Sequence, residues 1–296
     1  MNQKMAVKTK PVGLYQLIGR AKNGDLTSQD ILKAIRPEML LGDRERLLAW
    51  AKEFRFWEEY ARIYYHSEDS RSYRKLEKTM EELIDPKKGD IWLDAGCGPV
   101  TRMSKLIWKK SGEKVAKIFG IDIVLEKARE TLDSFIPLGL KYANLGERLP
   151  FSDELFDGIV ANVSLTYVID FQGKKGKEAF MEVMREMFRV LKPGGYIVWS
   201  TPKKNPFFFR NFLDGLPDMF SLKKQISHRA FGLYVGIKAL KYGFEITKKG
   251  KKGIYTFLEP KEYEEILREI GFINFRWKKT FAGQVWVNKA HKPNVV

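Results

Sequence analysis

Residues 91–103 have the sequence IWLDAGCGPVTRM, and this stretch decides the fold. Three apolar residues lead into Asp94, glycines follow at 96 and 98, and a proline precedes what looks like the start of a helix. Glycine lacks a Cβ, so it allows a sharp turn and a close approach to the backbone. The stretch therefore predicts a strand, a tight turn and a helix, with a ligand lying against the turn.

The chain downstream of residue 90 alternates between strand and helix patterns. This alternation predicts right-handed βαβ units and a parallel sheet. A helix over 262–272 and two strand-like segments then predict an antiparallel pair that ends the sheet. The expected strands are 90–96, 115–123, 140–145, 156–165, 195–202, 272–281 and 283–292, and the expected helices of this part are 101–110, 125–135, 176–191 and 262–272. A turn is expected at 192–195 (KPGG), where Pro193 would stop the preceding helix.

The first 85 residues have a helical pattern. A capping-box pattern begins a short predicted helix over 26–35, and apolar residues at three- and four-residue spacings predict a long amphipathic helix over 44–65. A further helix is expected over 71–83. The segment DPKKGD, residues 85–90, breaks this pattern and marks a candidate domain boundary.

Composition narrows the class of protein. The 296 residues are 44% hydrophobic and 30% charged, which is enough to form a core, and the net charge is +16. Such a charge favours nucleic acid, an anionic membrane surface or an acidic small molecule as partner, or it simply maintains solubility. The single cysteine rules out an internal disulfide and a cysteine-cluster metal site, and we expect no metal. The sequence shows neither a secretory signal nor a membrane-spanning apolar run, so we expect a cytoplasmic protein.

An acid at the end of the next predicted strand indicates the kind of ligand. Asp122 follows the glycine pair by about twenty residues, where a carboxylate can accept hydrogen bonds from both ribose hydroxyls. The third glycine of a dinucleotide fingerprint is absent, and Asp94 would repel a pyrophosphate. These residues favour a nucleoside cofactor with a cationic amino-acid part over a nicotinamide cofactor. The alternatives without a ligand are that Gly96 and Gly98 serve only a tight turn and that Asp122 is a helix cap.

Four motifs in order resemble the class I S-adenosylmethionine-dependent methyltransferases, in particular the menaquinone/ubiquinone-biosynthesis branch. They are LDAGCGP, GID, LPFSDELFDGIVAN and VLKPGGYIVWSTP. The resemblance implies a Rossmann-like, mostly parallel seven-stranded sheet with helices on both faces, an N-terminal helical extension and an inserted helical lid. The expected units are an extension or lid (1–85), the cofactor-binding core (86–202), an inserted basic and aromatic lid (203–253) and a helix with a strand pair completing the sheet (254–296).

The resemblance also assigns roles in binding S-adenosyl-L-methionine. The first motif would hold the methionine part and its amino group, an acid would hold the ribose, and the remaining residues would meet the adenine or the sulfonium. In that order the residues are Asp94, Gly96, Cys97 and Gly98; Asp122; Ile123, Asn144 and Leu145; and Asn162. Leu145 stands where the family often has an acid, which Asn144 would replace, and Val100 stands where a further glycine is common.

Methyl transfer is an in-line displacement, so the protein chiefly aligns the reactants and excludes water. A base is needed only where the nucleophile carries a proton with a high pKa. The candidate catalytic residues are His66, Tyr64 and Tyr167, and other candidates on the substrate side are Tyr60, Tyr65 and Ser164. Tyr64 matches the tyrosine of the family's A-x-x-Y-D segment, with Tyr65 in place of the aspartate.

The acceptor is narrowed by the residues after the fourth strand and by the insertion. Methyltransferases that act on the amino groups of adenine or glutamine usually carry Asn-Pro-Pro-Tyr after the fourth strand, where this chain has NVSLTY. Methyltransferases that act on a cytosine carbon need a cysteine nucleophile, and the one cysteine, Cys97, lies in the predicted cofactor turn. Both classes are therefore disfavoured. Within 203–253, apolar residues at helical spacing lie beside lysines, which suits an anionic membrane, an amphiphilic substrate or a packed lid. We expect a methyltransferase for a small-molecule or lipid-like acceptor, with a membrane surface as a candidate partner. The alternatives are an RNA methyltransferase and a non-catalytic cofactor-binding module.

Overall fold

The computed structural model describes residues 41–67, 70–125, 128, 135–219 and 226–294. The helix predicted over 26–35 lies outside the described residues, and so does most of the one predicted over 125–135. Within the described parts, the strands and helices follow one another in the expected order.

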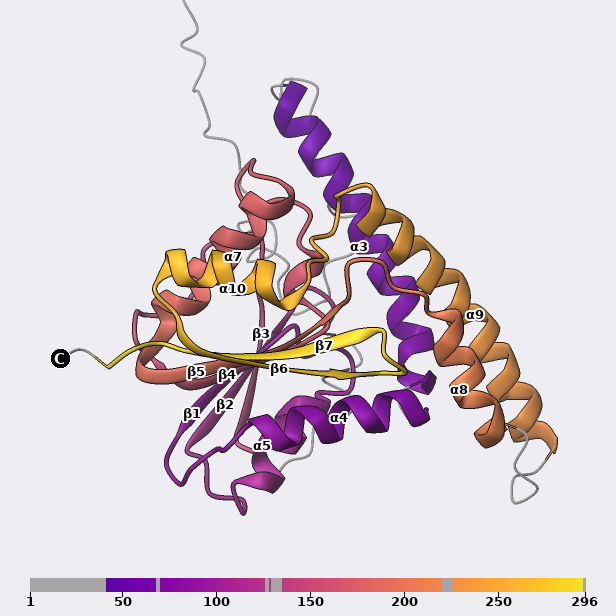
Figure 1. Ribbon diagram of the computed structural model, residues 1–296, viewed down its shortest axis with the longest axis horizontal. Coiled ribbons are helices and arrows are strands. Elements are labelled where there is room, and N and C mark those ends of the chain that lie inside the picture. Colours follow the sequence, from indigo (N-terminus) through magenta and orange to yellow (C-terminus); the bar gives the residue numbers. More distant parts are fainter. Residues whose placement is uncertain (1–40, 68–69, 126–127, 129–134, 220–225, 295–296) are drawn as a thin grey trace, which may run out of the picture.

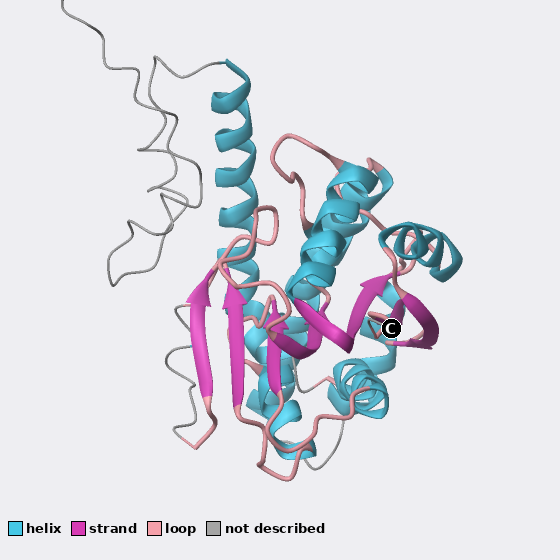
Figure 2. Ribbon diagram, turned by 90° about the vertical axis from the view of Figure 1, so that its left-hand side faces the viewer, coloured by secondary structure: helices cyan, strands magenta, loops and turns pink. Residues whose placement is uncertain are grey.

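The described strands form one seven-stranded sheet in the order β3-β2-β1-β4-β5-β7-β6. Six of the seven strands run in the same direction, while β7 is antiparallel to both of its neighbours, β5 and β6. Figure 2 shows strands side by side with their arrowheads at one edge. The bounds are β1 Ile91–Ala95, β2 Lys117–Asp122, β3 Leu138–Tyr142, β4 Phe156–Asn162, β5 Leu191–Pro202, β6 Ile273–Thr280 and β7 Val285–His291. The predicted Rossmann-like sheet and its antiparallel ending are confirmed.

Helices cover both faces of this sheet (Figure 1). α4 (Arg71–Leu83) and α5 (Arg102–Lys110) pack on one face, and α7 (Gly176–Val190) and α10 (Pro260–Ile270) pack on the other. Successive residues of β1 point to opposite faces, so Trp92 packs with the first pair and Leu93 with the second. A Cβ on Gly158 of β4 would lie 2.5 Å from the Trp92 ring, so this glycine makes room for the largest core side chain.

Two long helices and a short one cross beside the sheet rather than on its faces. They are α3 (Leu41–Ser67), α9 (Ile226–Lys251) and α8 (Phe209–Met219), and a short 3-10 helix, η1 (Leu165–Tyr167), follows β4. α3 and α9 lie side by side (Figure 1). The insertion between β5 and α10 is therefore helical, as predicted.

The chain between α7 and β5 differs from the expected turn. α7 ends at Val190, and β5 begins at the next residue, so residues 192–195 belong to the strand. The pairing register with β4 shifts at this point, because Leu191 pairs with Phe156 while Tyr196 pairs with Gly158. The prediction of a separate turn is wrong: the extra residues are absorbed as a bulge inside the strand.

Candidate functional site

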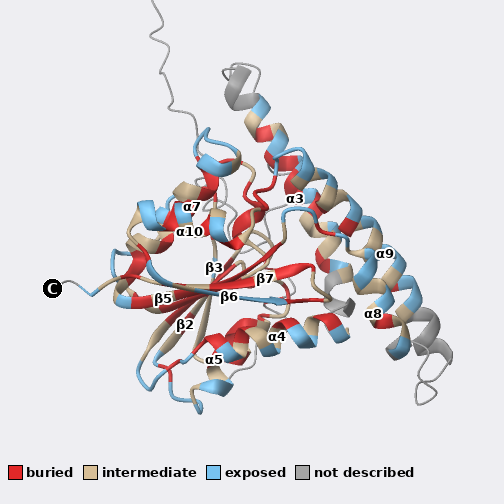
Figure 3. Cartoon of the chain, in the orientation of Figure 1, coloured by how far each residue is buried: buried red, intermediate tan, exposed pale blue. Residues whose placement is uncertain are grey.

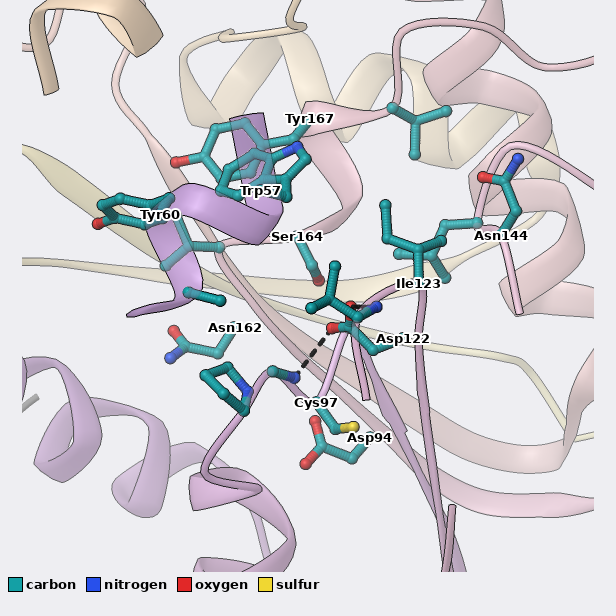
Figure 4. A pocket seen from close by; sticks show the side chains of 18 of the residues that line it. Trp57, Tyr60, Asp94, Cys97, Asp122, Ile123, Asn144, Asn162, Ser164 and Tyr167 are labelled. Carbon is teal, nitrogen blue, oxygen red and sulfur yellow. Dashed lines mark hydrogen bonds between the residues drawn. The ribbon is translucent and has the colours of Figure 1, made fainter. Parts of the chain in front are cut away.

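One cavity lies where β1, β2 and β4 end, bounded by the β1–α5 turn, α3 and η1. Figure 4 shows its lining, with Ile123 and Asn144 at one end and Trp57, Tyr60 and Tyr167 at the other. All nine residues predicted to bind the cofactor lie on its wall: Asp94, Gly96, Cys97, Gly98, Asp122, Ile123, Asn144, Leu145 and Asn162. Parallel strands bring their carboxyl ends to one edge of a sheet, which is why residues so far apart in the sequence meet here.

Asp94 is the buried acid of the cavity. Its Oδ2 accepts hydrogen bonds from the backbone N–H of Ser104 (2.9 Å) and from the Ser104 Oγ (2.7 Å). Its Oδ1 has no hydrogen-bond partner among the described residues. Burial raises the pKa of this carboxyl from 3.8 to about 7, since the two bonds from Ser104 only partly offset desolvation. The free oxygen is placed to accept a hydrogen bond from a ligand, most strongly from a cationic donor.

The glycine turn needs glycine at both positions, for different reasons. Gly96 has φ +78° and Gly98 has φ +64°, which L side chains rarely adopt. A Cβ on Gly96 would also lie 2.3 Å from the Cβ of Ser164, whereas nothing lies near the corresponding position of Gly98. Gly96 is therefore held by both conformation and close packing, and Gly98 by conformation alone.

Asp122 is held by backbone donors from two sides. Its Oδ2 accepts from the N–H of Gly98 (2.9 Å) and its Oδ1 from the N–H of Val124 (2.9 Å). Burial raises the pKa of this carboxyl, and the backbone bonds oppose the shift. Asp122 thus ties the glycine turn to the end of β2 (Figure 4), and each of its oxygens can accept a further bond.

Cys97 supplies packing rather than a nucleophile. Its side chain lies against Leu125 and Ala128. Burial raises the pKa of the thiol well above its ordinary value, with the nearby carboxylates acting in the same direction. A thiol held protonated is a poor nucleophile, which agrees with its expected role in the turn.

Two buried donors lie at the Ile123 end of the cavity. The Asn144 Oδ1 accepts from the N–H of Gly146 (2.9 Å), while its Nδ2 has no partner among the described residues. The same holds for Nε1 of Trp50, which lines the cavity from α3 and packs with Ile123. Of the nine such buried atoms among the described residues, three line this cavity, on Trp50, Asp94 and Asn144, where a polar ligand can pair with them. Leu145 contributes only apolar surface.

The opposite end is aromatic. The rings of Trp57 and Tyr167 lie 5.0 Å apart, and those of Trp57 and Tyr60 lie 5.7 Å apart. At the floor of this end, the Ser200 Oγ donates to the Asn162 Oδ1 (2.7 Å). This bond orients the Asn162 amide and leaves its Nδ2 as the group available to a ligand.

A buried ion pair clamps α3 to α9 above the cavity. Glu53 accepts from the Lys249 Nζ (2.7 Å), from Nε1 of Trp57 (2.9 Å) and from the Tyr255 hydroxyl. Burial and the neighbouring carboxylate raise the pKa of Tyr255 well above its ordinary value. Sequence reasoning missed Glu53, although an acid on the apolar stripe of a helix is an available signal. Other lining residues that it did not assign to the site are Trp50, Trp57, Tyr73, Arg102 and Ile246.

The structure describes the side chains of only some of the candidate catalytic and substrate-side residues. Tyr167 lines the cavity, as do Tyr60 and Ser164. Tyr64 and His66 belong to α3, but their side chains lie outside the described residues, and the same is true of Tyr65. The described residues include no group of three or more His, Cys, Asp or Glu arranged to bind a metal.

Comparisons with known proteins agree with this geometry. Residues 93–199 match a family model described as a methyltransferase domain. The demethylmenaquinone methyltransferase of Bacillus licheniformis is 31% identical over 41% of this chain and 48% of its own length. The malonyl-[acyl-carrier protein] O-methyltransferase of Erwinia pyrifoliae is 31% identical over 37% of this chain and 36% of its own length. The chain thus spans about half or less of the length of these relatives.

Among solved structures, one similar fold is a putative methyltransferase of Haloferax volcanii, solved in complex with the Trm112 methyltransferase activator. Its TM-score is 0.53 at 16% identity, covering 80% of this chain and 98% of that one. An identity this low supports the fold alone.

The residues present fit the cofactor of this family. Asp94 offers a free buried carboxylate oxygen for an amino group, Asp122 a fixed carboxylate for ribose hydroxyls, and Asn144 a free amide donor for an adenine nitrogen. Residues 93–199 match a methyltransferase domain, and the sheet order and the cavity around this segment agree with that match.

Proposed function

We propose that the protein is a cytoplasmic enzyme that transfers a methyl group from S-adenosylmethionine to a small, apolar or lipid-like acceptor. One observation carries this proposal. The cavity joins a polar part, which runs from Asp94 at the glycine turn to Asn144 and Trp50 and holds three buried side-chain atoms with no described partner, to an aromatic end built by Trp57, Tyr60 and Tyr167. A polar cofactor suits the polar part and an apolar acceptor suits the aromatic end.

When bound, S-adenosylmethionine supplies a methyl group on a positively charged sulfur. In our proposal the chain contributes binding and orientation around that group. Asp94 accepts from the amino group, Asp122 holds the ribose hydroxyls, and Ile123 and Trp50 enclose the adenine. The amide of Asn162, oriented by Ser200, would face the sulfonium end of the cofactor. The roof formed by α3 excludes water, which removes competing solvation from the transfer step.

The charges on the cavity wall favour an uncharged acceptor. Arg102 is paired with Glu77 at 2.5 Å, and Glu53 is paired with Lys249, so neither group is free to bind a charged acceptor. The aromatic rings instead offer a large apolar surface for a ring or chain. The name of one relative, a demethylmenaquinone methyltransferase, supports an apolar metabolite as acceptor rather than RNA.

Of the three proposed catalytic residues, Tyr167 is the one whose side chain the structure describes. Its hydroxyl stands at the aromatic end, where it can hydrogen-bond to the acceptor atom. The Tyr167→Phe variant keeps the ring contact with Trp57 and removes only this hydroxyl. We expect a lower kcat with cofactor affinity unchanged, whereas an unchanged kcat would assign Tyr167 to packing. Tyr64 and His66 stay in the proposal as alternatives.

The proposal is tested by methyl transfer from radiolabelled S-adenosylmethionine into a cell extract. The extract is then separated into lipid, RNA, protein and small-molecule fractions, and the Asp122→Ala variant serves as control. Label in the lipid or small-molecule fraction, lost in the variant, is the expected result. Label in RNA would show that the acceptor is RNA rather than a small molecule or lipid, an outcome that the net charge of +16 favours. Cofactor binding with no transfer to any fraction would indicate a non-catalytic module.

A further inference from the structure

Exposed apolar side chains gather on the inserted helices. The described residues include eleven large hydrophobic side chains that are exposed, and seven of these lie between residues 207 and 244. They are Phe207, Phe209, Leu213, Leu233, Tyr234, Ile237 and Phe244. Single exposed hydrophobic residues are ordinary, but a concentration in one segment marks a surface that contacts something.

The outer face of α9, in its part with described side chains (232–251), combines these residues with lysines. All exposed positions described in this helix are either large and apolar or lysine: Leu233, Tyr234, Ile237, Lys238, Lys241, Phe244, Lys248 and Lys251. Their spacing of mostly three or four residues places them along one side of the helix, which Figure 3 colours pale blue. Val235 and Ile246 are buried on the inner side, and Ile246 reaches the cavity.

α8 extends this surface. The segment before α8 packs tightly on α9, since a Cβ on Gly243 would lie 3.0 Å from the Cβ of Phe208. Next to it, the Phe207 and Phe209 rings lie 5.9 Å apart and are both exposed. We call the exposed residues of α9 named above, together with Phe207, Phe209 and Leu213, the α8–α9 surface.

We propose that the α8–α9 surface docks the protein on an anionic lipid bilayer. This inference rests on the proposed lipid-like acceptor, because it brings the cavity to where such an acceptor resides. An interfacial helix lays its apolar side chains among the acyl chains while its lysines meet the phosphates. None of the described helices is long and apolar enough to cross a bilayer, so the contact is peripheral.

The same residues fit a bilayer better than RNA. An RNA-binding face gains from arginine, from stacking rings and from polar contacts with backbone and bases. The described exposed positions of α9 include no arginine, and Arg210 is the one exposed arginine beside the residues of α8 named above. The aliphatic Leu213, Leu233 and Ile237 have nothing to gain against a phosphate backbone. The cavity wall carries Glu53, Asp94 and Asp122 as well as Arg102, so it is not predominantly basic, whereas the described exposed charged residues of α9 are all lysines.

The test is co-sedimentation of the full chain with vesicles of phosphatidylcholine containing 30% phosphatidylglycerol, and with phosphatidylcholine vesicles alone. No cofactor or acceptor is added, so docking is measured independently of methyl transfer. Each basic residue near an anionic surface strengthens binding about fivefold. We therefore expect the triple variant Lys238→Gln, Lys241→Gln, Lys248→Gln to partition about a hundredfold more weakly. The Ile237→Ser, Phe244→Ser variant should also weaken binding, with little change in its salt dependence.

A matched control removes the same charge at the opposite edge of the sheet. Lys88, Lys109 and Lys114 are exposed near the amino ends of β1 and β2, far from the cavity edge. Their triple Gln variant should bind vesicles nearly as well as the wild type. Equal loss in both triple variants would overturn a specific surface in favour of a general charge effect. Three other results would overturn the proposal. The wild-type protein could fail to bind anionic vesicles, it could bind RNA through these lysines, or it could form a dimer that the Ile237→Ser, Phe244→Ser variant disrupts.

Discussion

Replacing Asp94 by asparagine should stabilise the protein without ligand and weaken cofactor binding. The folded-state pKa of Asp94 is raised from 3.8 to about 7 by burial, so the ionised carboxylate is disfavoured in the folded state. That difference corresponds to roughly 4 kcal/mol of unfolding free energy at 1.36 kcal/mol per pKa unit. An asparagine oxygen can keep both hydrogen bonds from Ser104 without carrying the charge.

The sign of the pH dependence follows from the raised pKa. In the wild type, the contribution of Asp94 to stability is most favourable below about pH 4, falls as the pH rises towards 7, and is level above that. Asparagine does not titrate, so the advantage of the variant should be roughly 2 kcal/mol at pH 5 and roughly 4 kcal/mol at pH 8. Denaturant unfolding of both proteins at the two pH values measures this difference.

Binding should change in the opposite direction. The variant would present an amide N–H₂ where the wild type presents a carboxylate oxygen to the amino group of the cofactor. Loss of one charge-assisted hydrogen bond, about 1.5–3 kcal/mol, corresponds to a dissociation constant roughly 10- to 150-fold higher. Isothermal titration with S-adenosylmethionine at pH 8 measures it. Two results would refute the idea that the buried charge of Asp94 costs stability and serves binding. The variant could be less stable than the wild type at pH 8, or its gain in unfolding free energy could be equal at both pH values.

Two further predictions concern the turn and the roof. The Gly96→Ala variant places a Cβ against Ser164 at a positive φ and should lose about 3 kcal/mol or more together with cofactor binding, whereas Gly98→Ala meets open space and should lose only about 1 kcal/mol. Denaturant unfolding and cofactor titration of both variants check this contrast, and equal effects would contradict it. The Glu53→Gln variant leaves Lys249 without its charge partner and should lose about 3 kcal/mol of stability. A thermal shift measures this loss, and an unchanged melting temperature would mean that the pair does not clamp α3 to α9.

The sequence predicted the parallel sheet and its antiparallel ending, and the residues that it assigns to cofactor binding line one cavity. These features depend on local patterns. A strand that ends in an acid, followed by a glycine turn, is visible in consecutive residues, and the parallel arrangement brings Asp94, Asp122 and Asn162 to the same edge without further information. Residues 192–195 are the exception, because a strand bulge and a turn have the same glycine and proline pattern.

The roof of the cavity could not be predicted in the same way. The apolar stripe of α3 shows that the helix buries one face, but not which element it is buried against. Only the tertiary structure brings Glu53 to Lys249, which lies 196 residues away in the chain, and places Trp57 beside Tyr167. The amino-acid sequence by itself therefore determined the strand-end residues of the proposed cofactor end, whereas Trp50 comes to it from α3. The packing of α3 against α9 decided the aromatic end, where we propose that the acceptor binds, because contacts between distant helices depend on the shapes of whole faces rather than on any local motif.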